Sequence, residues 1–429
     1  MAWAAPRAGF DVVREQRDVV GAIALPLRQA AAETALIARA ADEGLGVVLA
    51  GQAHLNQLPV AARGRGFAAL PFAQPYPLHV ERTRMSATAL ADYAEAFLDA
   101  QLSAGATLAT TPAHVCDAEL SYGREQDLGL AHATIAAWHE RQAWRPPPQR
   151  PDAPPRELFA GIAVRGRGLV AGSARGDAAA RDGVGGAAAR DGVAGAPAGG
   201  GAGGAVARGR AGGDVVDRLI ELYAPLDVSG YWLTVFDADG SGAQLGAVAE
   251  LALGLQHATG RPVTVSGIAS LHEALLASGV AATCAGGGAA GASFPPKAID
   301  GDEVTGIAVE VFHPAILGTV PPGPHAADAL EWLFVRHPCR CGEHPLHEPP
   351  RRRRAALRHN AWQLAAEARD ATRLVPIIDE QRLAARIGRA NAIRRQLALA
   401  PLQPGWAAVA AAARTRRAAA ADTAMRLDA

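Results

Sequence analysis

The chain has 429 residues, and 49% of them are hydrophobic, so it is long enough to bury a large core. Its 42 basic and 42 acidic residues cancel, which excludes a global charge that would draw it to nucleic acid or to an anionic membrane. Four cysteines are too few for a disulfide framework in a chain of this length. The sequence shows neither a signal-like N-terminus nor an apolar run long enough to span a bilayer, so we expect a cytoplasmic protein that does not enter membranes.

Short β-rich runs alternate with helical segments along most of the chain. The runs consist mostly of apolar residues, as buried strands do, and they end near glycine or polar residues. The segments between them have apolar side chains at helical spacing. The predicted strands are Val19–Leu25, Gly46–Ala50, Thr107–Thr111, Leu158–Val164, Gly230–Phe236, Val263–Val265, Val280–Cys284 and Gly306–Phe312. The predicted helices between them include 28–43, 86–103, 127–144, 215–223 and 245–257.

The stretch 261–294 shows the repeating unit most clearly. A strand ends at Gly267, Ser270 stands where a helix N-cap is expected, and Gly279 closes the helix before the next strand. A strand–helix–strand unit implies a parallel sheet with helices outside it. Eight candidate strands in this length predict an α/β fold of the (β/α)8 TIM-like barrel type. An open doubly wound sheet is the alternative, although no GxGxxG follows the first strand.

Composition divides the chain further. We expect residues 1–335 to form the barrel, interrupted by a disordered Ala/Gly-rich insertion at 170–213 that contains a near-repeat and has little to bury. Residues 336–360 form a candidate zinc-binding segment, and 361–429 a helical C-terminal extension. Arginines at 382, 386, 389, 394 and 395 follow one another along this extension, where they form either a solvated face or a surface for RNA phosphates.

Polar side chains follow three of the predicted strands. His54, His114 and Asp237 each come just after a strand end, which is where barrel enzymes place their catalytic groups. They are therefore candidate catalytic residues. An ordinary surface histidine at position 54, or an Asx turn at Asp237, explains the same pattern without chemistry.

Glycines at the ends of the last strands suggest an anion site. Gly267 ends one strand, and Gly286, Gly287 and Gly288 follow the next, so their backbone N–H groups can bind phosphate or a flavin phosphate. Tight turns in a glycine-rich protein are the alternative explanation.

A cysteine and histidine cluster follows the barrel segment. Cys339, Cys341 and His344 have C-x-C-x2-H spacing, and His359 lies one or two turns into the next predicted helix. Four such donors predict a closed, structural zinc site, with His347 competing with His344 for a place in it. Two unrelated cysteines in a loop are the alternative.

The cluster resembles the zinc segment of the tRNA-guanine transglycosylases, which are barrels with a C-x-C-x2-C group and a later histidine after the last strands. Here His344 replaces the third cysteine, and His359 matches the later histidine. The resemblance covers about the last 170 residues and includes the strand–Gly–helix–Gly–Val segment. The family's catalytic aspartate has no counterpart in 279–284, so Cys284 stands where the nucleophile is expected.

Three functions follow from these observations. The resemblance implies a divergent transglycosylase-like barrel that recognises a nucleobase or tRNA, with altered or lost base exchange and a structural zinc ion. The glycine loop favours instead a phosphate- or flavin-binding enzyme for a small metabolite. The helical C-terminal segment suggests a third possibility, a non-catalytic interaction protein.

Overall fold

The structure is a computed structural model, and it describes twelve stretches of the chain. These are residues 2–4, 10–57, 65–73, 85–115, 122–143, 156–170, 213–237, 242–268, 272–286, 311–320, 325–372 and 376–402. The insertion predicted at 170–213 lies almost wholly outside the described residues, and so do Ser270, Gly287, Gly288 and the segment after residue 402.

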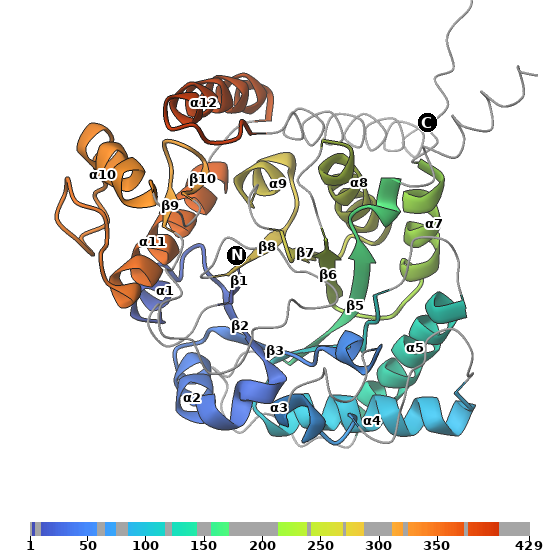
Figure 1. The fold of residues 1–429 in the computed structure, drawn as a ribbon. Coiled ribbons are helices and arrows are strands. Elements are labelled where there is room, and N and C mark those ends of the chain that lie inside the picture. Colours follow the sequence, from blue (N-terminus) through green and yellow to red (C-terminus); the bar gives the residue numbers. More distant parts are fainter. Residues whose placement is uncertain are drawn as a thin grey trace, which may run out of the picture.

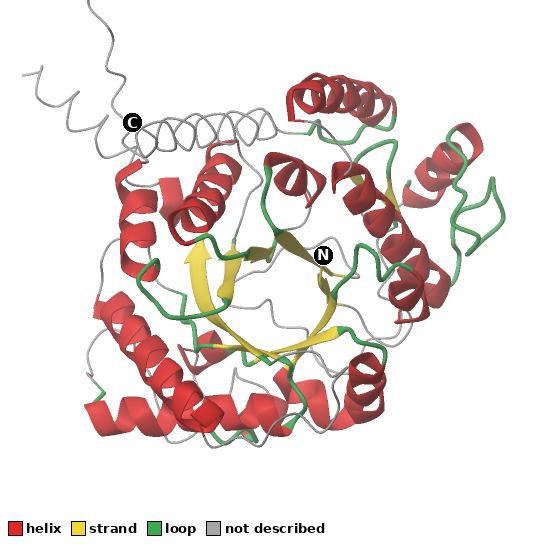
Figure 2. Ribbon diagram, turned by 180° about the vertical axis from the view of Figure 1, so that it is seen from behind, coloured by secondary structure: helices red, strands yellow, loops and turns green. Residues whose placement is uncertain are grey.

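A closed barrel of parallel strands forms the centre of the molecule (Figures 1 and 2). Strands β1 to β8 follow one another around it in chain order, and β1 pairs with both β2 and β8. The strands are β1 (Ala2–Ala4), β2 (Ala22–Pro26), β3 (Gly46–Ala50), β4 (Leu108–Thr110), β5 (Glu157–Arg165), β6 (Gly230–Phe236), β7 (Val263–Ser266) and β8 (Ala282–Gly286). The expectation of an α/β fold built on a parallel barrel is therefore confirmed.

The strand that closes the barrel is not the predicted one. Of the predicted strand Gly306–Phe312, residues 306–310 lie outside the described residues, and Phe312 belongs to β9 (Phe312–His313), which pairs antiparallel with β10 (Gly318–Thr319) in a separate sheet. The three-residue strand Ala2–Ala4 lies instead between β2 and β8, with Ala2 opposite both Ala22 and Cys284. Three residues are too few to show a period of two, so the sequence carries no visible signal for this strand.

Helices surround the barrel (Figure 2). They are α1 (Phe10–Glu15), η2 (Leu27–Glu33), α2 (Thr34–Asp42), η3 (Ala53–Gln57), α3 (Arg65–Ala68), α4 (Ala87–Ser103), α5 (Tyr122–Ala143), α7 (Gly213–Tyr223), α8 (Gly242–Thr259), α9 (His272–Ser278), α10 (Ala326–Arg336), α11 (Arg353–Thr372) and α12 (Pro376–Gln396). None of the described helices is both long and apolar enough to cross a membrane.

Helix α11 belongs to the ring of helices. It packs against α1 and α9, which follow the first and seventh strands, whereas α12 packs against α9 from further out (Figure 1). The predicted boundary between a zinc segment and a separate extension at residue 361 therefore falls inside α11. The segment from β9 to α11 completes the ring next to the strands that close the barrel.

Small and large side chains alternate inside the barrel. Ala22 and Ala24 of β2 leave room for Phe159 of β5 and Trp232 of β6, and all four are buried in one cluster. The larger hydrophobic clusters lie between the strands and the outer helices, as expected when parallel strands are covered on both faces.

Close packing of β5 against the end of β4 gives a first prediction. A Cβ atom at Gly161 would lie 2.6 Å from the backbone oxygen of Thr111, so Gly161→Ala should destabilise the fold by about 1–3 kcal/mol. Gly388 of α12 faces open space, and Gly388→Ala should be neutral or stabilise by up to about 1 kcal/mol. Urea unfolding monitored by circular dichroism measures both. Equal effects of the two substitutions would contradict the close approach.

Candidate metal centre and barrel mouth

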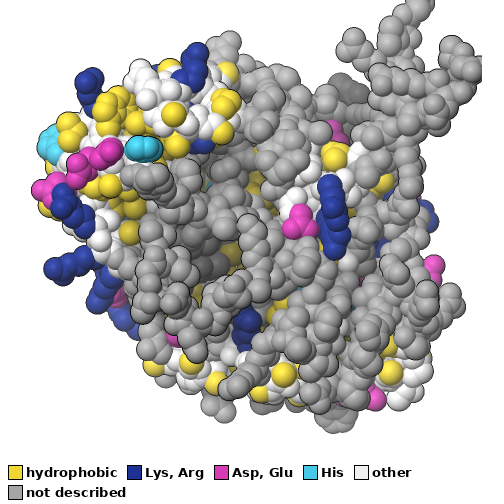
Figure 3. All heavy atoms as spheres, in the orientation of Figure 1, with side chains coloured by type: hydrophobic (Ala, Val, Ile, Leu, Met, Phe, Trp, Pro, Cys, Tyr) yellow, Lys and Arg dark blue, Asp and Glu magenta, His cyan; other side chains and the backbone are white. Residues whose placement is uncertain are grey.

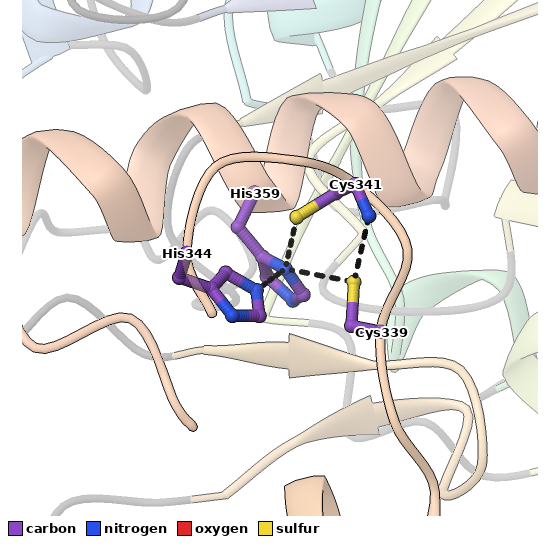
Figure 4. A group of neighbouring side chains, drawn as sticks. All are labelled: Cys339, Cys341, His344 and His359. Carbon is purple, nitrogen blue, oxygen red and sulfur yellow. Dashed lines mark hydrogen bonds between the residues drawn. The ribbon is translucent and has the colours of Figure 1, made fainter. Parts of the chain in front are cut away.

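Four donor side chains meet where the loop after α10 passes α11 (Figure 4). Cys339, Cys341 and His344 come from this loop, and His359 points toward them from the second turn of α11. The four ligand atoms lie within 4.8 Å of one another, and Cys339, Cys341 and His359 are buried. This group can hold a metal ion.

The distances between donors match a tetrahedral centre. Nδ1 of His359 lies 3.5 Å from Sγ of Cys339, 3.4 Å from Sγ of Cys341 and 3.0 Å from Nε2 of His344. Around one tetrahedral ion with ordinary zinc bond lengths, nitrogen and sulfur would be about 3.6 Å apart and two nitrogens about 3.3 Å. These three separations differ from the tetrahedral values by about 0.3 Å or less, and all four ligand atoms lie within 4.8 Å of one another.

Hydrogen bonds to backbone carbonyls orient both imidazoles. Nε2 of His359 lies 2.7 Å from the oxygen of Phe312, and Nδ1 of His344 lies 2.9 Å from that of Pro345. Since a carbonyl only accepts, each of these nitrogens carries the proton. The other nitrogen of each ring faces the sulfurs with its lone pair. In metal-binding histidines a hydrogen bond from one ring nitrogen commonly orients the other nitrogen toward the metal in this way.

The two thiols share their proton unequally. A hydrogen bond from the Cys341 thiol holds the pKa of Cys339 well below its usual range, and the same bond raises the pKa of Cys341. Nε2 of Gln363 also donates to Sγ of Cys339 at 2.7 Å. The pocket thus favours a thiolate, the form of cysteine that binds metals.

The structure separates the two histidines that competed for the site. His344 is a member of the cluster, whereas His347 is exposed and lies outside it. The loop is also joined to α11 and α1, because Arg358 donates to Glu343 at 2.9 Å and to Asp11 at 3.5 Å. Sequence spacing identified the donors, but it gave no sign of the Phe312 carbonyl or of Gln363, which are brought in by tertiary contacts.

The three candidate catalytic residues lie past the ends of β3, β4 and β6. The ring of His54 is 4.8 Å from that of Phe236, and Asp237 follows Phe236 directly. His114 is close enough to His54 to disfavour its protonation, and Arg165 of β5 lies 3.9 Å from Asp237. His54, His114 and Asp237 therefore stand at the carboxyl end of the barrel.

His114 is held in a buried polar network that the sequence did not reveal. Its Nδ1 lies 2.8 Å from Oδ1 of Asp127 on α5, and its backbone N–H donates to the same oxygen. Oδ2 of Asp127 accepts from Tyr223, which in turn accepts from Arg124 at 2.9 Å. Asp127 lies within a predicted helix, with no local pattern that distinguishes it from a surface carboxylate.

Cys284 is buried, and two of the four candidate glycines stand at strand ends. Cys284 lies in the middle of β8, inside the barrel, and burial raises the pKa of its thiol to about 12, so it is protonated at neutral pH. Gly267 directly follows β7 with a φ of 83°, and Gly286 ends β8. Gly287 and Gly288 lie outside the described residues.

The arginines of α12 do not form one solvated face. Arg394 donates to the carbonyl of Ile316 at 3.1 Å, and Arg386 pairs with Glu367 of α11. Arg382, Arg389 and Arg395 are exposed. On the face in Figure 3, basic side chains stand among acidic and hydrophobic ones over the side where α10, α11 and α12 lie.

Comparisons of this chain with protein-family models, with curated proteins and with solved structures found no match. Function is therefore inferred from the residues of this chain and from their geometry.

Removing a donor should release the metal and weaken the fold. We expect Cys339→Ser and His359→Gln to lose metal content and to lower the melting temperature by several degrees, because bound metal contributes to folding. Exposed His347→Gln is the matched control and should change neither. Since each donor must be deprotonated to bind, acid should lower metal affinity in the unaltered chain. Elemental analysis and thermal unfolding test this. Unchanged metal content in both donor variants would contradict the assignment.

His54 gives a prediction about acid stability. Burial, and then the nearby His114 and Arg28, lower its pKa from 6.5 to about 3, so it stays neutral in the folded state while the unfolded chain binds a proton. Its contribution to stability is complete above pH 6.5 and is lost as the pH falls toward 3. His54→Gln should therefore flatten the fall in stability across this range, measured by urea unfolding. Exposed His132→Gln is the control, and an equal effect of both would contradict the assignment.

Proposed function

We propose that this chain is a (β/α)8 barrel whose Cys2His2 group holds a structural zinc ion, and that it recognises a nucleobase, alone or in tRNA, without exchanging it. The observation that carries the proposal is the group of Cys339, Cys341, His344 and His359, closed on all sides by protein donors and located where α11 completes the ring of helices.

Zinc is the metal that suits these donors. Two thiolates and two imidazoles in a tetrahedral arrangement are typical of structural zinc, and four protein donors leave no open position for a substrate. When bound, the ion would balance the charge of the two thiolates. Cys339, Cys341 and His344 would hold the loop, and His359 would hold α11.

The position of this group in the chain supports the transglycosylase-like part of the proposal. The donors follow the last barrel strand and precede the helix that packs against α1 and α9. The tRNA-guanine transglycosylases, which the sequence resembles, also carry zinc after their last strands. A protein of this kind would bring its nucleobase ligand to the carboxyl end of the barrel, where His54 and His114 lie.

The absence of base exchange follows from β8. Its residues from Ala282 to Gly286 include no carboxylate, and the thiol of Cys284 is buried inside the barrel with a raised pKa. A nucleophile that attacks a glycosidic carbon needs an exposed, ionised group. Of the described residues at this strand, none supplies one, so we expect binding without covalent chemistry.

Three measurements test the proposed function. Purified protein should contain about one zinc ion per chain by elemental analysis, and it should bind guanosine or unmodified tRNA in equilibrium dialysis. Incubation with radiolabelled guanine should leave no label in the tRNA, because the nucleophile is missing.

Each part of the proposal has its own contrary result. Absence of zinc would remove the structural metal. Incorporation of labelled guanine would show that a nucleophile exists elsewhere. Failure to bind both guanosine and tRNA would remove nucleobase recognition, and would leave the zinc assignment standing.

A further inference from the structure

Two hydrogen-bond acceptors at the carboxyl end of the barrel have no partner among the described residues. They are Nε2 of His114 and Oε1 of Gln52, and both atoms are buried. A buried polar atom without a partner is uncommon, because it has lost the free energy of its hydrogen bonds to water and gained none in return. A ligand that donates to these atoms would recover that energy.

The buried network around His114 determines which of its nitrogens is free to accept. Asp127 is paired through one oxygen with His114 and through the other with Tyr223, beside Arg124 at 3.9 Å. Oδ1 of Asp127 also accepts the backbone N–H of His114, and a carboxylate oxygen that accepts there accepts the Nδ1–H of the imidazole as well. Nε2 of His114 is therefore left with a bare lone pair.

His313 is a buried histidine with both ring nitrogens bonded, to the carbonyl of His337 at 3.0 Å and to the N–H of Ala315 at 3.2 Å. His114 is just as buried, yet only one of its nitrogens has a partner. Nδ1 of His272, at the start of α9, is also buried without a partner, but no second unpartnered acceptor from a neighbouring strand end accompanies it among the described residues.

Gln52 is held in an unusual conformation. Its φ is 54°, in the left-handed region that non-glycine residues rarely adopt. It follows β3 and directly precedes the turn that carries His54. Strained backbone of this kind persists where the surrounding structure holds it, and it often occurs at ligand-binding loops. Its side-chain oxygen is buried rather than turned to solvent.

The two acceptors belong to the same end of the barrel. Gln52 follows β3 and His114 follows β4, and these strands are neighbours with Val48 opposite Leu108. Parallel neighbours lie about 5 Å apart, so the loops that follow them start side by side. Nearby rings are those of Phe236, against His54, and Tyr93, 6.3 Å from His114. Both rings are buried, so they border the two acceptors without offering an open face for stacking.

We propose that His114 Nε2 and Gln52 Oε1 together accept hydrogen bonds from two adjacent N–H groups on the edge of one planar heterocyclic ligand. This inference rests on the proposed nucleobase recognition and identifies the residues that would read the base. A ring that presents neighbouring N–H and NH2 donors, such as the pyrimidine half of guanine, fits the pair. A ring that presents an acceptor beside a donor leaves one of the two atoms unsatisfied.

The state of His114 in the ligand-free protein is the first test. Nitrogen-15 NMR of histidine-labelled protein, with the signal assigned through His114→Gln, should show a protonated Nδ1 and a bare Nε2. Addition of isocytosine, a soluble ring with adjacent N–H and NH2 donors, should shift the Nε2 signal. Cytosine, which presents an acceptor beside its NH2 group, should shift it far less. A protonated Nε2 in the free protein overturns the inference.

Calorimetry of isocytosine binding provides the second test. Gln52→Met should weaken binding about tenfold, because it removes one acceptor, and should leave the melting temperature unchanged or raised. Gln101→Met is the contrasting variant. Its amide is fully bonded to the backbone of Thr110, so this change should lower stability and leave affinity within about twofold. Gln52→Met removes no internal hydrogen bond among the described residues, so we expect it to fold. Its affinity for isocytosine can therefore be measured even if His114→Gln does not fold.

The outcomes separate the two proposals. Isocytosine binding that leaves the His114 signal and the Gln52→Met affinity unchanged overturns this pair of acceptors, although nucleobase recognition stands. No isocytosine binding at millimolar concentration also overturns the pair, and the guanosine and tRNA measurements then decide the proposed function separately. A shifted Nε2 signal together with weaker binding by Gln52→Met supports the inference.

Discussion

The pairing of β1 with β8 is the interaction on which the rest of the structure depends. Strand β1 pairs with β2 through Ala2 and Trp3 and with β8 through all three of its residues, so the parallel sheet has no open edge. Closure gathers the carboxyl ends of all the strands at one end of the barrel, and so brings together loops that are far apart in the chain. Closure also places α1 and α9 on the same side of the barrel, where α11 packs against both of them.

The sequence predicted most of the barrel and all four members of the Cys2His2 cluster. Strands such as Gly46–Ala50 and Gly230–Phe236 have long runs of buried residues, and the donors Cys339, Cys341 and His344 are close together in the chain, so local patterns were sufficient. Other parts were invisible for physical reasons. Ala2–Ala4 is too short to have a pattern, and the partnership of His114 with Asp127 is created by tertiary packing.

The metal centre and the barrel are coupled through α11. His359 and Asn360 are adjacent on this helix, and they hold the carbonyl and the N–H of Phe312, at 2.7 Å and 2.8 Å. Helix α11 thus carries a candidate metal donor and is hydrogen-bonded to β9. Other residues of the same helix pack against α1 and α9 of the ring around the barrel. A metal ion that orders the loop therefore also orders α11, although it lies away from the end of the barrel where the ligand is expected.

The β1–β8 pairing also has a consequence for the time course of folding. Ala2 can pair with Cys284 only after that residue has been translated, almost 300 residues later. Contacts with so large a sequence separation form slowly. Until then the nascent sheet has two open edges that can pair with other chains. The metal donors emerge after β8, so a metal ion can complete its site only once the residues that close the barrel have been synthesised. A metal ion held by this cluster would therefore fix α11 only after the strands of the barrel are complete.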